Sequence, residues 1–175
     1  MRNNRGFTLV EIISIIALLG LIIGICVPSI MVASTNTKKK TLQTKVDNIE
    51  KAAVLYGQDN REEFTENCQI NETEYYECMG KIKVKDLISE IIQKQDDGSW
   101  KVVRDQYINY DEENPEVEET ELGNDTKLRT KGKIKNPIDE SKNLNECEIQ
   151  IYKKYGKIYA VYLAKDTEDE TCWYK

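Results

Sequence analysis

The chain has 175 residues, which is enough for one modest domain and a membrane anchor. Its 31 Asp and Glu residues outnumber its 25 Lys and Arg residues, so net charge gives it no general attraction for nucleic acid or anionic lipid. The sequence contains no histidine, which excludes Ser-His-Asp triads, HExxH zinc sites and Cys-His catalytic pairs.

An almost uninterrupted apolar run extends from Phe7 to Ala33, and Glu11 lies near its start. As a helix, residues 12–33 would extend for roughly 33 Å, about the thickness of the hydrocarbon core of a bilayer. A carboxylate at membrane depth is unfavourable by roughly 3 kcal/mol, so an acid there is a functional hypothesis by default.

Four interpretations of this segment compete. A secretory signal peptide usually has a shorter apolar region, about 7 to 15 residues long, that ends at a small-x-small site. A lipoprotein signal at Cys26 is disfavoured by the bulky Ile25 that precedes it. A plain signal anchor would explain the apolar run but not Glu11. The fourth interpretation is a prepilin leader, which accounts for both features.

The stretch RGFTLVEIISIIALLGLIIGICVPSI, residues 5–30, closely resembles the N-terminus of type IV pilins and related pseudopilins. That family has a short basic leader ending in Gly, then Phe, then a Thr-Leu-Val-Glu block at the start of an apolar helix. The resemblance implies a leader at 1–6, cleavage between Gly6 and Phe7, and methylation of the Phe7 amine with help from Glu11. The implied partners are like or related pilin subunits, prepilin peptidase, the inner-membrane assembly platform with its ATPase, and membrane lipid before assembly.

Cleavage would give Glu11 a physical role, because it exposes the α-amino group of Phe7 at the edge of the apolar phase. When helices stack with an axial stagger, the Glu11 carboxylate of one subunit can meet the Phe7 amine of the next. A paired charge in a low dielectric is far less unfavourable than a lone one. We therefore interpret Glu11 as the residue that sets the register of assembly. The alternative is a hydrated carboxylate at the level of the lipid headgroups.

Three further residues of the run suit helix bundling. Gly20 and Gly24 form a GxxxG pair, which allows close approach between helices in membranes. Pro28 lacks an N–H, so the carbonyl of Gly24 loses its usual partner, and the pilin resemblance implies that this stretch loses helix on assembly. The alternative is a lipid-facing glycine pair without a role. We expect Cys26 to be a free thiol.

Cations flank both ends of the run, so the count of Lys and Arg does not decide the orientation in the membrane. The leader is too short to hold a domain, and the later cysteines favour an oxidising compartment. We therefore place the bulk of the chain outside the cytoplasm, first as a single-pass membrane protein and then in a surface or periplasmic filament.

The helix is predicted to continue beyond the membrane, because apolar residues recur there at helical spacing. This stripe consists of Leu42, Val46, Ile49, Ala53 and Tyr56. Gly57 is interpreted as a stop signal. The predicted organisation is thus a transmembrane and assembly helix at 7–33, its amphipathic continuation at 34–57, and an extracellular head at 58–175.

Within the head, residues 83–94 place Leu87, Ile88, Ile91 and Ile92 at helical spacing and are predicted to form a helix. Residues 99–110 are β-branched and aromatic and predict a strand. The clearest hairpin lies at 148–163, with a turn at Tyr155-Gly156 and one face available to cover the long helix. The predicted class is α+β, a helical spine packed on a small antiparallel sheet in a pilin-like arrangement.

Residues 111–121 are strongly acidic, and residues 127–135 carry a cation at every odd position. The simplest interpretation is a solvated loop followed by an edge strand protected by lysines. A second is complementary charge between neighbouring subunits. A third is a basic strand that binds DNA phosphates, but no aromatic residues interleave with the cations, and we do not expect nucleic acid as a partner.

Four cysteines lie beyond the membrane segment, and four allow three connectivities. Short loops favour Cys68–Cys78 and Cys147–Cys172, and an exported location favours disulfides. Two pairs of zinc ligands are disfavoured by the spacings.

The acids near Asp97 and at 166–170 could hold Ca²⁺ weakly, but they lack an EF-hand pattern, and we assign no metal site, cofactor or catalytic residue. We expect a structural subunit of a type IV pilus or related filament and not an enzyme. The alternatives are a minor pseudopilin of a type II secretion or DNA-uptake machine, and a plain signal-anchored surface or binding protein.

Overall fold

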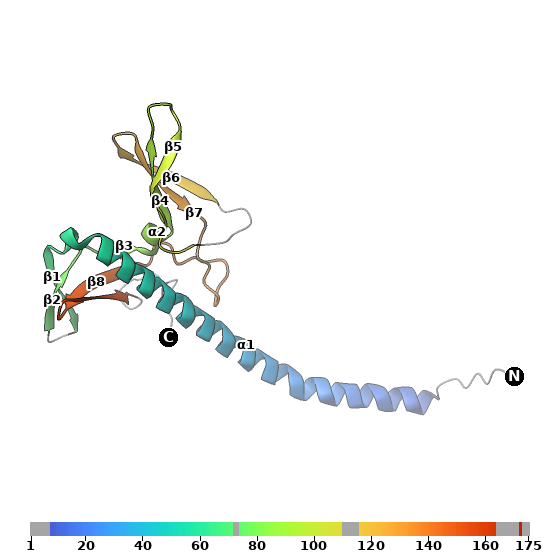
Figure 1. Cartoon of the computed structure of the whole chain (residues 1–175). Coiled ribbons are helices and arrows are strands. Elements are labelled where there is room, and N and C mark those ends of the chain that lie inside the picture. Colours follow the sequence, from blue (N-terminus) through green and yellow to red (C-terminus); the bar gives the residue numbers. More distant parts are fainter. Residues whose placement is uncertain (1–7, 72–73, 110–115, 164–171, 173–175) are drawn as a thin grey trace.

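A computed structural model describes residues 8–71, 74–109, 116–163 and 172, with only the backbone described at 24–32 and at 71. Figure 1 shows one long, gently curved helix, α1, with two antiparallel sheets gathered at its C-terminal end. The mixed helix and sheet class predicted from the sequence is confirmed. Among the described residues, no helical stretch is both long and apolar enough to cross a membrane.

Helix α1 spans Leu9–Asp59, which is 51 residues, and is capped by Thr8 and Asn60. It does not stop at Gly57, so that prediction was wrong. The glycine is there because the helix touches the sheet: a Cβ at this position would lie 2.8 Å from Cγ2 of Ile151 and 3.1 Å from Cγ2 of Ile158. A one-turn 3-10 helix, η1 (Arg61–Glu63), follows.

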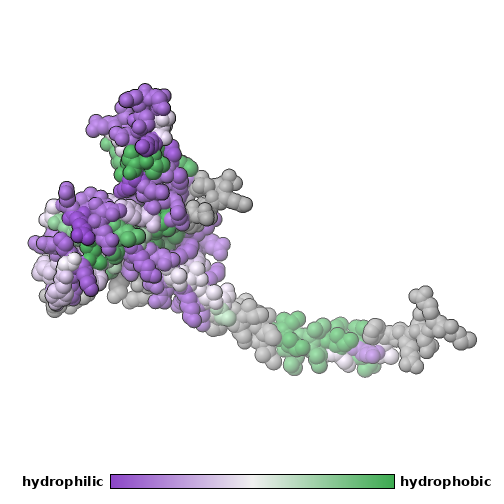
Figure 2. All heavy atoms as spheres, viewed as in Figure 1, coloured by the Kyte–Doolittle hydropathy of each residue, from purple (hydrophilic) through white to green (hydrophobic). Residues whose placement is uncertain are grey.

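The two halves of α1 differ in burial. The predicted stripe is confirmed in the second half, where Leu42, Val46 and Ile49 are each 1% exposed and Ala53 is fully buried. Tyr56 packs at the margin of this core. The described side chains of the first half are exposed, and Figure 2 shows them as a bare hydrophobic surface along the helix. In the single chain nothing covers that surface within the described residues.

The five-stranded sheet lies against the second half of α1. Its central strand β8 (Glu148–Lys154) pairs along its whole length with β9 (Lys157–Tyr162). On its other side β8 pairs with β2 (Glu74–Cys78) and β3 (Ile82–Lys83), and β1 (Glu66–Asn71) extends the sheet beyond β2.

The β8–β9 hairpin is the one predicted from the sequence. Its turn residues Tyr155 and Gly156 have φ values of 50° and 75°, as a two-residue type I′ turn requires. Ile149 and Ile151 are fully buried on the face that covers α1, so the hairpin covers the helix with one face as expected, and the structure shows which face it is. The carboxylate of Glu50 on α1 also accepts a 3.0 Å hydrogen bond from the N–H of Tyr162. Helix and hairpin are therefore held by apolar packing and by a polar contact at the edge of β9.

A four-stranded sheet stands beside the end of α1 with strand order β5-β4-β7-β6 (Figure 1). These strands are β4 (Ser89–Lys94), β5 (Trp100–Arg104), β6 (Val117–Gly123) and β7 (Thr126–Lys131). The strand predicted within 99–110 is confirmed as β5. The helix predicted at 83–94 was wrong beyond its first turn, α2 (Val84–Leu87).

β4 forms in place of the expected helix because it is paired with another strand along both of its edges. β4 hydrogen-bonds to β5 along one edge and to β7 along the other, and each partner satisfies backbone groups that a helix would satisfy internally. Within β4, Ile91 and Ile92 are β-branched residues that suit a strand, and Ile92 is 1% exposed.

An aromatic cluster joins the four-stranded sheet to α1. The rings of Tyr56 and Tyr107 meet edge to face at 5.3 Å, and the Arg104 guanidinium lies 5.5 Å and 5.8 Å from their centroids. The Tyr107 hydroxyl donates a 2.9 Å hydrogen bond to Asp59. Burial, followed by this hydrogen bond and the nearby Asp59 charge, raises the pKa of Tyr107 to about 12. The cluster thus fixes the base of the sheet against the last turn of the helix.

The close approach at Gly57 gives a stability prediction. Gly57→Ala should gain about 1 kcal/mol of helix propensity but lose about 1–3 kcal/mol by overpacking against Ile151, for a net destabilisation. Gly80→Ala is the matched control, because a Cβ there meets no atom within 4 Å. Thermal unfolding of the full chain in detergent, followed by circular dichroism, should give a lower Tm for Gly57→Ala alone. An equal or higher Tm would contradict the close approach.

Candidate functional site

Glu11 lies in the first turn of α1 and forms a capping box with Thr8. The Glu11 carboxylate accepts hydrogen bonds of 3.3 Å from the Thr8 backbone N–H and from the Thr8 hydroxyl. In return the Glu11 N–H donates to the Thr8 hydroxyl oxygen at 3.3 Å. A negative charge at a helix N-terminus is also favoured by the helix dipole. The carboxylate is therefore held at the end of the helix where the chain leads to Phe7.

The sequence interpretation missed this role of Thr8, although a Thr three residues before a Glu is the sequence signature of a capping box. Gly6 and Phe7 lie outside the described residues. The predicted cleavage, methylation and pairing between Glu11 and a neighbouring amine thus stay predictions. The geometry adds that Glu11 is positioned by its own helix before any neighbour is present.

The residues predicted to pack helices lie within the continuous helix α1. A Cβ at Gly20 would meet no atom within 4 Å, so this face of the helix is open in the single chain. At Gly24, Cys26 and Pro28 only the backbone is described, and it is helical. Their roles in packing, and the free thiol at Cys26, stay predictions.

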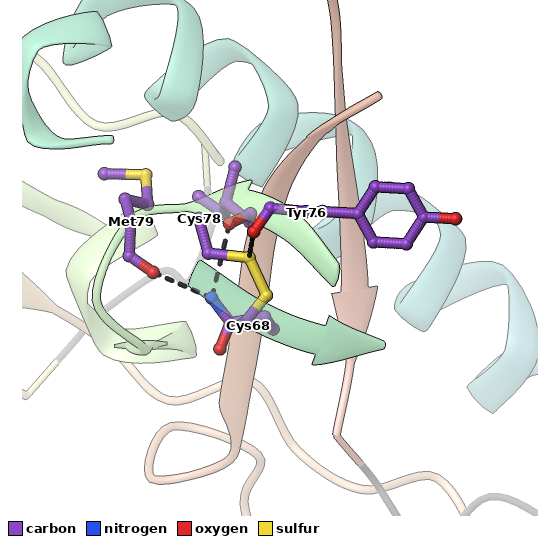
Figure 3. The surroundings of a disulfide bond; sticks show 6 residues. Cys68, Tyr76, Cys78 and Met79 are labelled. Atoms are coloured by element: carbon purple, nitrogen blue, oxygen red, sulfur yellow. Dashed lines mark hydrogen bonds between the residues drawn. A yellow bond between two sulfur atoms is a disulfide. The ribbon is translucent and has the colours of Figure 1, made fainter. Parts of the chain in front are cut away.

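The structure contains both disulfides of the short-loop connectivity. Cys68 is joined to Cys78 with a Cα–Cα separation of 5.8 Å, and Cys147 is joined to Cys172 with a separation of 5.6 Å. Figure 3 shows the first bridge, which links the neighbouring strands β1 and β2 beside the buried Met79. The second bridge ties the end of the chain to the start of β8. Disulfides rather than zinc sites hold the four cysteines.

The acidic and basic segments are paired with each other within one subunit. Part of the acidic run forms β6, the edge strand, and the basic run forms β7, which lies between β6 and β4. The expectation of an acidic loop followed by a basic edge strand was therefore wrong. Glu119 contacts Lys127 at 3.2 Å and Arg129 at 3.0 Å across the two strands. Most of the basic charge is thus neutralised inside the subunit.

Glu90 on β4 is the most buried acid of this charged face, with a side chain 4% exposed. It contacts Arg129 at 3.2 Å and Lys131 at 2.9 Å. A buried carboxylate needs such partners, because removing one of them leaves an uncompensated charge. The cations of β7 therefore neutralise a buried carboxylate inside the subunit. The alternating cations of the sequence did not indicate this role.

The described residues contain no cluster of three or more His, Cys, Asp or Glu side chains suited to a metal ion. Asp97 accepts hydrogen bonds from the Ser99 N–H at 2.8 Å and from the Ser99 hydroxyl at 2.6 Å, which lower the pKa of this carboxyl. The Oδ1 atom of Asp97 therefore holds the turn before β5. The acids at 166–170 lie outside the described residues.

Three tyrosines form a row of contacting rings on the five-stranded sheet. Tyr152 stacks on Tyr159 at 5.6 Å and meets Tyr76 at 5.2 Å. Lys154 lies 5.2 Å from the Tyr76 ring and 3.4 Å from a carboxylate oxygen of Glu74. These tyrosines come from β2, β8 and β9, so only strand pairing brings them together, and the sequence analysis did not single them out.

Comparison with known proteins finds a match at the N-terminus. A family model described as the prokaryotic N-terminal methylation motif matches residues 1–27. No curated protein and no solved structure matches the chain at a significant level. The match includes Gly6, Phe7 and Glu11 and ends before the head.

The two disulfides give a second stability prediction. In the chain-entropy description, the loop closed by Cys147–Cys172 contributes about 3.5 kcal/mol and the shorter loop closed by Cys68–Cys78 about 2.7 kcal/mol. Replacing both cysteines of either pair with serine should lower the Tm in proportion. Only loss of Cys68–Cys78 should speed amide hydrogen exchange mainly in β1, because β2 is the one described strand that pairs with β1. Equal protection of β1 with and without this bridge would contradict that assignment.

Proposed function

We propose, from the premise that residues 1–27 carry the signature of type IV pilins and pseudopilins, that the chain is a structural subunit of a type IV pilus or related filament. Prepilin peptidase would cleave it between Gly6 and Phe7, and the new Phe7 amine would be methylated. The subunit would rest in the membrane through its N-terminal helix until the assembly platform and its ATPase transfer it into the filament. The methylation motif is the observation that carries this proposal.

The contrast between the two halves of α1 supports the proposal. In the first half, Leu9 is 77% exposed and Leu18 is 65% exposed, whereas Leu42 in the second half is 1% exposed. Burial of a leucine side chain stabilises by roughly 1.5–3 kcal/mol, so a helix that exposes many such side chains needs an apolar environment. Lipid before assembly and neighbouring helices after it would supply that environment.

Glu11 would then set the register between neighbouring helices. Its carboxylate is held at the start of α1 by Thr8, where the amine of an axially staggered neighbour could reach it. A pairing of that carboxylate with the Phe7 amine of the next subunit would offset the unfavourable burial of both charges. The hydrogen bonds from Thr8 would fix the carboxylate before the neighbour arrives, so little side-chain freedom remains to be lost on assembly.

The salt bridges of β7 favour a structural subunit over a nucleic-acid-binding protein. Lys127, Arg129 and Lys131 lie in salt bridges with Glu119 and Glu90 and are not presented as a free basic strip. Phosphate binding would have to displace these partners.

Processing is the first step to test. We expect the mature protein to begin at Phe7 with a methylated amine, and we expect Gly6→Val to block cleavage. Intact-mass measurement of membrane-extracted protein from the native host would show both results. A mature start near residue 30 would instead indicate a secretory signal peptide, and an uncut wild-type chain would indicate a plain anchor.

The role of Glu11 is tested by separating its charge from its capping function. Glu11→Gln retains the capping geometry but removes the charge, whereas Thr8→Ala weakens the cap by about 0.5–2 kcal/mol and retains the charge. If Glu11 pairs with a neighbouring amine, Glu11→Gln leaves that amine buried without a partner, at about 3–5 kcal/mol per interface. We expect Glu11→Gln to abolish filaments and Thr8→Ala to reduce them mildly.

Both variants should be expressed in the native host, with processing, membrane level and sheared-filament yield measured together. Normal cleavage with loss of filaments for Glu11→Gln supports the register. Wild-type filament yield from Glu11→Gln, or a stronger defect from Thr8→Ala, would reject it. Absence of surface filaments from the wild type would favour the minor pseudopilin or the plain anchor.

A further inference from the structure

The four-stranded sheet has two open edges. β5 and β6 are its outer strands, and no described segment pairs with the far side of either. All seven residues of β6 are exposed, as are residues 100–103 of β5. An edge strand presents unpaired N–H and C=O groups and is a template for pairing with another chain. In the five-stranded sheet the β9 edge is different, because there the Tyr162 N–H already donates to Glu50 of α1.

The two open edges carry opposite charge. β6 presents Glu118 and Glu121, which have no salt-bridge partner among the described residues, in addition to the paired Glu119. β5 presents Lys101, which is exposed and likewise without a salt bridge in the described part of the chain. Arg104 does not contribute to this edge, because its guanidinium lies over Tyr56 and Tyr107.

Both edges also expose apolar side chains. On β5, Trp100, Val102 and Val103 are 38%, 44% and 53% exposed. On β6, Val117 and Leu122 are 52% and 54% exposed. Apolar side chains gathered along an open strand favour association with another surface, and the charges decide which surface. Two β6 edges would bring rows of glutamates together, which disfavours a symmetric pairing.

Strand direction allows the unlike edges to meet. Every neighbouring pair in the order β5-β4-β7-β6 is antiparallel, so β5 and β6 run in opposite directions. A second copy placed side by side in the same orientation therefore brings its β6 against β5 as a further antiparallel pair. Each copy would still have one open edge, so the contact repeats without closing, as a helical filament requires.

The charged residues also share one face of the sheet. Lys101 lies opposite Gln93, and Gln93 lies opposite Thr126. Glu118 lies opposite Thr130, and Thr126 and Thr130 are four residues apart on β7, so they point to the same side. Along the strand, Thr126 and Thr130 are about 13 Å apart, so a second copy displaced by this distance would bring its Glu118 opposite Lys101. The two side chains would then lie on the same side of the shared strand pair.

We propose that β5 of one subunit pairs with β6 of a second copy of this chain, so that the four-stranded sheets of neighbouring heads form a continuous antiparallel sheet. This inference rests on the proposed function, because it takes copies of the chain to lie side by side in a filament. It assigns the head its own contact between subunits, in addition to the contact between the N-terminal helices.

Cysteine crosslinking in intact cells tests the contact directly. The variants are Lys101→Cys, Glu118→Cys and the double variant, each at an exposed position and each in a Cys26→Ser background that removes the expected free thiol. The reagent is a bismaleimide that spans about 8 Å. Within one subunit the two edges are three strand spacings apart, about 14 Å, so the reagent cannot join them there. We expect dimers at most from the single variants and a ladder of higher oligomers from the double variant.

A charge exchange provides the second test. In chains without the added cysteines, Lys101→Glu and Glu118→Lys should each weaken the contact and lower the yield of sheared filaments by about tenfold. The combined exchange should restore that yield. Thr120→Ser on β6 is a control that keeps the charge unchanged. Failure of the combined exchange to restore what either single change removes would overturn the pairing, as would single changes without effect.

The outcomes separate this inference from the proposed function. Wild-type yields of filaments without a crosslinked ladder would overturn the sheet pairing and leave the filament function intact. A ladder without any filament would support the pairing and reject the filament function. Dimers from Lys101→Cys alone, without a ladder from the double variant, would show a symmetric β5–β5 contact and would also overturn the proposal.

Discussion

The packing of the second half of α1 onto the β8–β9 hairpin is the contact on which the rest of the head depends. Leu42, Val46 and Ile49 bury the helix stripe, and Ile149 and Ile151 bury the facing side of the hairpin. Gly57 lets the two backbones approach where a side chain would not fit. Because this contact stops at the middle of α1, it leaves the first half of the helix free to meet lipid or neighbouring helices.

The features that the sequence could predict are those with local or strongly periodic signals. The stripe on α1 has the period of a helix, and the 148–163 hairpin has alternating residues and a Tyr-Gly turn, so both were found. Which face of the hairpin covers the helix could not be predicted, because both faces are partly apolar. The cysteine pairs followed from loop length. The N-terminal motif followed from family resemblance, and the matching family model bears out that resemblance.

The features that the sequence could not predict depend on which strands lie side by side. Residues 83–94 have helical spacing, but β4 is held as a strand by β5 and β7, which come later in the chain. Gly57 was interpreted as a helix stop because it follows the last residue of the stripe. Its contact with Ile151 could not be predicted, because that residue lies much later in the chain. The pairing of Glu90 with Arg129 and Lys131, and the stacking of Tyr152 on Tyr159, likewise need the sheet register.

The Cys147–Cys172 bridge has a mechanical consequence. The whole β8–β9 hairpin lies between these two cysteines in the chain, so the bridge encloses the hairpin in a covalent loop. Tension applied between α1 and the C-terminal end of the chain would pass across the bridge and not through the strands of the hairpin. The element that holds α1 is thus shielded from being pulled open along its own backbone. In a subunit under tension, segments outside this covalent loop would therefore extend first, and the hairpin would stay packed on α1.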